Sequence, residues 1–268
     1  DWSSDVCSSD LTRGAVALNA AAGFVNNQIP VNRLSPAALA LAKQLPQTTD
    51  PCGRTTYSNP TKPIENQGIF KMDWQITQDH QLFGRFINTT TFWNPPFADN
   101  KNLLSTSLGG RNSDAQSLAI GDTMVLSSAL VNNIRFTFHS SNVHRTNSDY
   151  FDATSLGVKN TYSYVPNVAL LAISNSFNLG LGTEFDSYYR PKTYAFSDDL
   201  TYVKGAHQWG FGGVVNLSHW NLNSNVRTSP GFTFDGSATG LPLADFMTGR
   251  VRQFRQSSPD RKSTRLNS

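Results

Sequence analysis

The sequence is short of charged residues and of long apolar runs. Only 15% of its 268 residues are charged, against roughly 25% in a typical soluble domain. Its apolar runs, such as Val168–Ile173, are far shorter than the ~20 residues of a membrane-spanning helix. These two shortages exclude a helical membrane protein and favour sheet over charged helices.

The patterns that carry catalysis, cofactors or metals are also missing. The five histidines have no HExxH or other ligand spacing, and no serine lies in a GxSxG elbow. Asp198 and Asp199 are neighbours, so in a strand they point to opposite faces and cannot act as a facing pair. We therefore expect no enzymatic activity, no cofactor and no metal site. The formal charge of only +3, without a basic run, predicts no nucleic-acid partner.

The two ends of the sequence can be encoded by complementary strands of the same DNA. DNA that encodes residues 260–268, DRKSTRLNS, can be chosen so that its reverse complement, in another frame, encodes residues 2–10, WSSDVCSSD. The string is also recognisable as a common sequencing adapter. We therefore expect residues 1–11 and 260–268 to be translated adapter around an open fragment of a longer gene. Without Cys7, only Cys52 remains, so no intrachain disulfide is expected.

Residues 12–66 read as loop with one short helix. Ser35, Pro36 and the apolar run 37–45 before Pro46 match an N-cap, a first-turn proline, a helix body and a stop. From Gln67 onward the period of the apolar residues changes to two. This change predicts a loop and helix segment that leads into a sheet over residues 67–259.

The sheet is expected to contain three hairpins. Strands are predicted in pairs over 67–76 and 81–89, 116–126 and 131–141, and 194–203 and 208–218. Turns of about four residues join each pair, whereas residues 88–114 and 142–193 form long connections rich in polar residues. Short and long connections thus alternate, which puts all turns at one end of an up-and-down sheet. Strands of about ten residues with that asymmetry are typical of outer-membrane barrels.

The fold predicted is therefore all-β: an antiparallel up-and-down meander that forms a partial transmembrane β-barrel, with a short N-terminal helix. Lys71 and Arg135 fall in the polar phase of their strands, as they must if the other phase faces lipid, where a basic residue costs ~2–4 kcal/mol. Asp122 and Asp198 fall in the apolar phase, which a bulge would correct. The alternation also fits a soluble secreted β-sandwich that binds carbohydrate, or an adhesin-like module.

Aromatic and basic side chains near the long second connection are candidates for ligand contact. Tyr162, Tyr164 and Arg190 could grip a sugar, a peptide or an anionic chelate, and His139 lies where a predicted strand meets this loop. Tyr188 and Tyr189 fit an interfacial aromatic girdle better. Trp74, Trp93 and Trp209 are expected on the girdle or the lipid face.

Short sequence pieces, in order along residues 25–250, resemble one known family. The pieces are NQIP and NRLSP over 27–36, Asp73 with LFGR over 82–85, LVNNIR over 130–135, FSDDLT over 196–201, KGAH over 204–207, Gly212-Gly213, FTFDG over 232–236, and Gly240 with ADFMTG over 244–249. Each piece alone is weak, but their order is specific. The chain resembles part of the β-barrel of a TonB-dependent outer-membrane receptor of the Oar-like group.

The resemblance implies a barrel of about 22 strands, plugged by an N-terminal domain. Such a receptor lies in the outer membrane of a two-membrane bacterium and contacts its lipid. It imports a carbohydrate, a peptide or a siderophore-like ligand when the TonB complex pulls on the plug. The sequence shows no plug and no TonB box, so we expect a fragment with about six to eight strands, which could not transport by itself.

Overall fold

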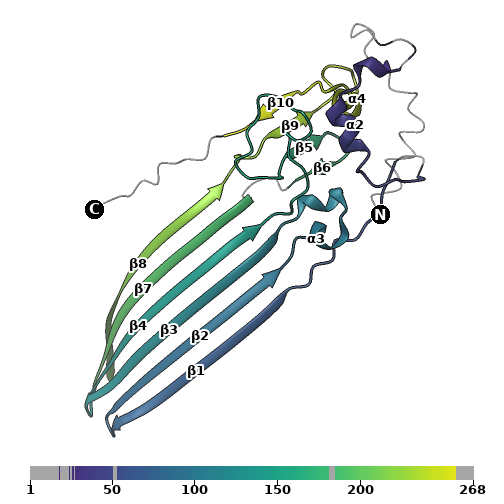
Figure 1. The fold of residues 1–268 in the computed structure, drawn as a ribbon. Helices are drawn as coiled ribbons and strands as arrows, with labels where there is room; N and C mark the ends of the chain where they lie inside the picture. Colours follow the sequence, from purple (N-terminus) through teal and green to yellow (C-terminus); the bar gives the residue numbers. More distant parts are fainter. Residues whose placement is uncertain are drawn as a thin grey trace.

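The computed structural model describes residues 28–50, 53–180 and 185–257, together with Leu18, Phe24 and Asn26. The predicted adapter segments, residues 1–11 and 260–268, lie outside the described residues. Two parts of the fold can be followed in Figure 1: a sheet of long strands, and a smaller group of short strands and helices at one end of it.

The large sheet has six antiparallel strands in the order β1-β2-β3-β4-β7-β8. Their bounds are β1 Ile64–Thr77, β2 His80–Trp93, β3 Gly110–Ser127, β4 Leu130–Thr146, β7 Phe185–Lys204 and β8 His207–Asn225. Each strand pairs with the next long strand along the chain. This order confirms the predicted up-and-down meander.

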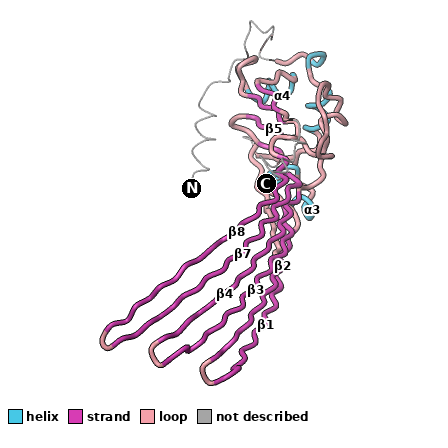
Figure 2. The backbone as a smooth tube through the Cα atoms, turned by 90° about the vertical axis from the view of Figure 1, so that its left-hand side faces the viewer, coloured by secondary structure: helices cyan, strands magenta, loops and turns pink. Residues whose placement is uncertain are grey.

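The three hairpin turns are tighter than predicted. Each contains two residues, 78–79, 128–129 and 205–206, where about four were expected. Register shifts at Gln75/Thr77 and Val125/Ser127 accommodate the first two turns, and Gly205 adopts a positive φ of 61° in the third. All three turns lie at the same end of the sheet (Figure 2), as the alternation of connection lengths predicted.

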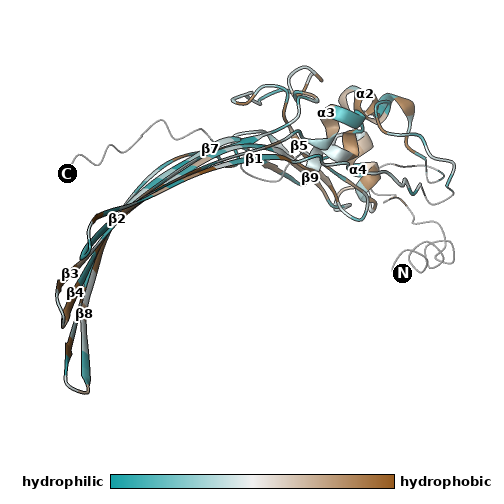
Figure 3. Ribbon diagram, turned by 90° about the horizontal axis from the view of Figure 1, so that it is seen from below, coloured by the Kyte–Doolittle hydropathy of each residue, from teal (hydrophilic) through white to brown (hydrophobic). Residues whose placement is uncertain are grey.

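The strands extend well beyond the predicted segments, and they bend together along their length (Figure 3). β7 begins at Phe185 rather than Tyr194, and β3 begins at Gly110 rather than Gln116. Each strand gains one residue at the turn end, and the rest of the extra residues lie toward the end away from the turns. The sequence there is polar on both faces, as in Asn112–Asp114, so apolar alternation could not reveal these strand ends.

The second part, which we call the cap, consists of the four-stranded sheet β10-β9-β5-β6 with its helices, and the sequence did not predict this sheet. Its strands are β5 Leu170–Ile173, β6 Asn178–Leu179, β9 Gly231–Phe234 and β10 Gln253–Arg255. β5 and β9 run parallel. The helical segments are η2 Val31–Arg33, α2 Pro36–Ala42, α3 Pro96–Asn100, η3 Leu103–Ser107 and α4 Pro242–Thr248. The cap lies at the end of the long strands opposite the turns (Figures 1 and 2).

A compact apolar core holds the cap together. Leu41 from α2, Ile173 from β5, Phe234 from β9 and Phe246 from α4 are each 4% exposed or less. The rings of Phe234 and Phe246 meet edge to face with centroids 5.6 Å apart, a favoured geometry for aromatic pairs. Residues far apart in the sequence thus build one core.

The predicted N-terminal helix is present as α2, although it ends at Ala42 rather than Leu45. Ser35 is its N-cap, and its Oγ accepts a hydrogen bond from the Ala38 N–H at 3.4 Å. The Ser35 N–H in turn donates to the carbonyl of Met247 at 2.8 Å. The local N-cap signal was therefore sufficient to find the helix, but not its contact with α4.

Candidate functional site

One face of the large sheet, which we call the apolar face, carries an unbroken row of apolar side chains across all six strands. Strand register aligns these residues one beside the next. The row consists of Phe70, Phe86, Leu118, Phe138, Tyr194 and Leu217. The next row toward the turns is almost as apolar and consists of Met72, Gly84, Ile120, Phe136, Phe196 and Val215.

Within the described part of the chain, no protein layer covers these side chains. Phe70 is 65% exposed, Leu217 60% and Phe196 49%. The face continues toward the turns through Trp74 and Trp209, as predicted for these two residues. On β7 it runs from Tyr194 to Tyr202, close to the roughly 9–11 residues with which a tilted strand crosses a bilayer. An exposed apolar surface of this size marks an interaction site, and its dimensions suit lipid.

The opposite face of the sheet, the polar face, carries the charged residues. Lys71 and Arg85 are partners in the register of β1 and β2, and Arg135 lies on the same face. Lys71 also forms an ion pair with Asp73 at 2.8 Å. The structure thus confirms that Lys71 and Arg135 avoid the apolar face. Trp93 lies on this face too, below the guanidinium of Arg111 at 5.7 Å, so it is not a lipid-face residue, and its place in an aromatic girdle stays a prediction.

Asp122 and Asp198 lie on the apolar face, and no bulge moves them off it. The register of the strands is regular at both positions. Instead, each carboxylate has a polar partner on a neighbouring strand: Nε2 of His80 lies 2.7 Å from Oδ1 of Asp122, and Nδ2 of Asn132 donates to Oδ1 of Asp198 at 2.6 Å. Pairing of this kind lowers the cost of a polar group beside lipid.

Arg190 lies at the far end of the apolar face, beyond the row that contains Tyr194. Its guanidinium stacks over Tyr188 at 4.7 Å, and its Nε–H donates to Oδ1 of Asn142 at 3.0 Å. The ring of Tyr188 also stacks on His144, with centroids 4.1 Å apart. Sequence reasoning missed the part that Asn142 and His144 play here, because β4 was predicted to end at Ser141.

The other predicted ligand-contact residues lie elsewhere. His139 is on the polar face, paired with Thr193, so the sheet separates it from Arg190. Tyr162 and Tyr164 lie in the cap with their rings stacked at 6.2 Å, and Gln256 accepts from the Tyr162 N–H at 3.2 Å. The structure therefore unites the two tyrosines but does not gather the four residues into one site.

Two features are absent from the described residues. None of the helices in these ranges is long and apolar enough to cross a membrane. Within the same part of the chain, no three histidine, cysteine, aspartate or glutamate side chains lie together as metal ligands do. The distinctive chemistry of the described structure therefore lies in its two-faced sheet and its apolar cap.

Comparison with known proteins agrees with this geometry. A family model described as "Outer membrane beta barrel domain" matches residues 3–268. No curated protein matches the chain, and no solved structure matches it.

Proposed function

Because the chain belongs to the family of outer membrane beta barrel domains, which lie in the outer membrane of Gram-negative bacteria, we propose that it is barrel sequence of a TonB-dependent receptor of the Oar-like group. Its cargo would be a carbohydrate, a peptide or a siderophore-like compound. Its partners would be outer-membrane lipid, the ligand, and the TonB complex acting through a plug domain. The proposal assigns no catalytic step to the chain.

One observation carries the proposal: the two ends of the sheet are built differently. Every turn at one end has two residues, whereas the cap and all long connections lie at the other end (Figure 2). In outer-membrane barrels the short turns are periplasmic and the long loops extracellular. By this analogy the cap would lie outside the cell, where a receptor meets its ligand, which supports the proposal. The ordered sequence pieces from 27 to 249 favour the TonB-dependent class over other barrels.

The membrane family argues against the soluble sandwich considered above. In a soluble sandwich, a second sheet would cover the apolar face. Here Phe70, Phe196 and Leu217 lie uncovered in the described structure. A hydrocarbon environment for these residues is consistent with both the geometry and the family.

Energy-dependent import tests the proposal. Cells with and without the gene would be given fluorescent oligosaccharides, peptides and ferric siderophores, in the presence and absence of a protonophore that removes the energy source of TonB. A TonB-dependent receptor should import at least one of these compounds only in cells that carry the gene, and the protonophore should stop that import. Gene-dependent import that continues with the protonophore would contradict the proposal and indicate a passive pore.

A further inference from the structure

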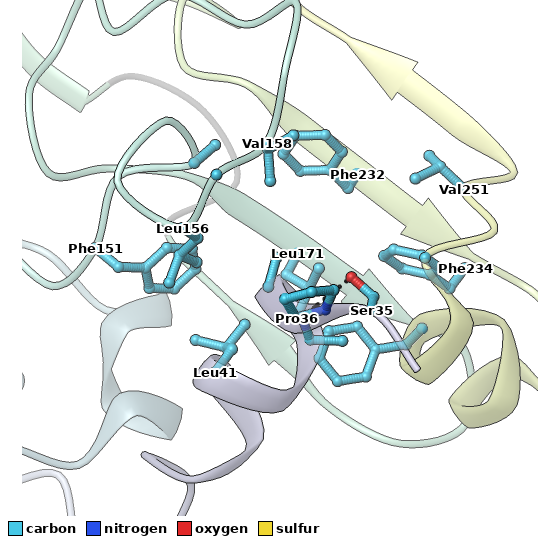
Figure 4. Close-up of a pocket in the computed structure, with 16 residues that line it drawn as sticks. Ser35, Pro36, Leu41, Phe151, Leu156, Val158, Leu171, Phe232, Phe234 and Val251 are labelled. Carbon is cyan, nitrogen blue, oxygen red and sulfur yellow. Dashed lines mark hydrogen bonds between the residues drawn. The ribbon is translucent and has the colours of Figure 1, made fainter. Parts of the chain in front are cut away.

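The apolar core of the cap contains a cavity of about 340 Å³. Its lining comes from α2, the segment 151–158, β5, β9, α4 and Val251. Figure 4 shows these side chains arranged around a common space, with Phe151 and Leu156 on one side and Phe234 and Val251 on the other. Its floor is formed by buried core residues such as Phe234 and Phe246, and it opens to the surface beside the exposed Val251.

The walls of the cavity are firmly held. The buried carboxylate of Asp245 accepts hydrogen bonds from the N–H of Thr239 at 2.8 Å and from its hydroxyl at 2.6 Å, which fixes the loop before α4. The Ser174 N–H donates to the carbonyl of Phe234 at 3.0 Å, which ties the end of β5 to β9. These bonds fix the elements that carry Phe234 and Phe246 into the cavity lining.

The side chains that line the cavity indicate which kind of ligand it can bind. Phe151, Phe232, Phe234 and Phe246 supply aromatic surfaces, and Ser35 brings a side-chain hydroxyl to the cavity wall (Figure 4). The Ser35 oxygen accepts from the Ala38 N–H only at 3.4 Å, and its O–H can donate to a ligand. Small-molecule sites typically have about 300–1,000 Å³ and combine an apolar lining with a few polar groups.

We propose that this cavity binds a small, mostly apolar molecule of aromatic size that carries one hydrogen-bond acceptor directed at Ser35. The ligand would make van der Waals contacts with the side chains that face one another across the pocket and would remove their apolar surface from water. Binding needs only the cap, so it holds whether or not import depends on TonB. It differs in chemistry from the sugar, peptide or chelate that Tyr162, Tyr164 and Arg190 suggested.

Photolabelling tests the cavity in outer-membrane vesicles that contain the protein. The probe is a trifluoromethyl-phenyldiazirine with a benzylic hydroxyl, and benzyl alcohol in excess is the competitor. Mass spectrometry should find label on the segment 151–158, and the competitor should remove it. The same probe dissolved in the bilayer should label the apolar face around Phe196 without competition, which provides an internal control for membrane partitioning.

A matched pair of variants on α2 separates binding from general effects on the fold. Ala37 lines the cavity, whereas Ala40 is exposed and does not. Ala37→Trp should fill the space and reduce labelling of 151–158 at least about tenfold, since a packed interior leaves no room for the probe. Ala40→Trp should leave it unchanged. Val251→Trp fills the cavity from another wall and should repeat the Ala37→Trp result.

A variant of Ser35 tests the proposed hydrogen bond between its hydroxyl and the ligand. Glycine keeps most of the value of an N-cap, so Ser35→Gly should preserve α2 while it removes the hydroxyl, and labelling of 151–158 should fall severalfold. Unchanged labelling in Ser35→Gly would overturn the acceptor assignment. Label on 151–158 that benzyl alcohol does not remove, or that survives both tryptophan variants, would overturn the cavity as a binding site.

Discussion

The large sheet and the cap use aromatic side chains in opposite ways. On the apolar face of the sheet, Phe70 is 65% exposed and Phe196 49%. In the cap, Phe234 and Phe246 are each only 4% exposed. The cap provides its own apolar surroundings, whereas the sheet requires them from outside. We infer from this difference that one chain is adapted to two solvents, hydrocarbon along the strands and water around the cap.

The largest effect is expected from removal of a cap aromatic. Phe246→Ala should destabilise the cap by about 3–5 kcal/mol, the usual cost of emptying a buried phenylalanine site. Limited proteolysis of vesicles should then cut the cap readily, while heat-modifiable gel mobility of the barrel stays unchanged. If the variant lost both the protease resistance of the cap and the heat-modifiable mobility of the barrel, the cap and the sheet would be one folding unit. That result would contradict the contrast drawn between the two regions.

The second-largest effect is expected from a charged side chain on the apolar face of the large sheet. In a full-length parent protein, Phe136→Arg places a cation on the apolar face and should cost about 2–4 kcal/mol near mid-bilayer. Heat-modifiable mobility should be impaired far more than in the neighbouring control, Arg135→Gln, which changes the polar face. Equal effects of the two variants would contradict the assignment of the faces.

A smaller effect is expected at Tyr150, beside the cap core. Its hydroxyl donates to the carbonyl of Ala169 at 2.6 Å, and burial raises the pKa of this phenol above its ordinary value. Tyr150→Phe keeps the ring and removes the bond, which should cost the cap about 1 kcal/mol. Urea-dependent proteolysis should show a modest downward shift of the midpoint. A loss as large as that of Phe246→Ala would refute the view that apolar burial, not this bond, dominates the cap.

The smallest effect is expected from pH at Asp152. Partial burial tends to raise its pKa, but hydrogen bonds donated by Ser163 and Thr154 outweigh burial and hold the pKa below the ordinary value. Its contribution to stability is therefore present above the ordinary pKa of ~3.9 and is lost as pH falls through the lowered value.

Asp152→Asn should accordingly flatten the acid end of a pH series of cap proteolysis, because the variant lacks at neutral pH the small stabilisation that the wild-type carboxylate loses in acid. Asp235, whose pKa is lowered chiefly by a hydrogen bond from Ser237, offers a second carboxylate for comparison. An unchanged acid slope in Asp152→Asn would show that this carboxylate does not contribute to acid sensitivity.

The sheet could be predicted from sequence because its signal is local. Residues 133–139 alternate strictly enough to assign Phe136 and Arg135 to opposite faces. The α2 helix was found for the same reason, through Ser35 and Pro36. Neither depended on knowledge of a distant part of the chain.

The cap and the contact residues could not be predicted in the same way. β5 and β9 have four residues each and pair across a long stretch of intervening chain, so no periodic pattern marks them. The sequence shows which residues of one strand share a face, because side chains alternate along a strand. It does not show which residues of β4 and β7 lie opposite one another. Sequence alone therefore could not show that His139 and Arg190 lie on opposite faces.

The most direct test of the two-solvent account is spin-label accessibility along β7. In a background with Cys7→Ser and Cys52→Ser, single cysteines at Tyr194, Ala195, Phe196 and Ser197 would carry the label in lipid bilayers. The account predicts that labels at Tyr194 and Phe196 are relaxed by oxygen dissolved in the bilayer, and that labels at Ala195 and Ser197 are relaxed more by an aqueous nickel chelate. Equal accessibility at all four positions, or the reversed order, would contradict the claim that the apolar face lies in lipid.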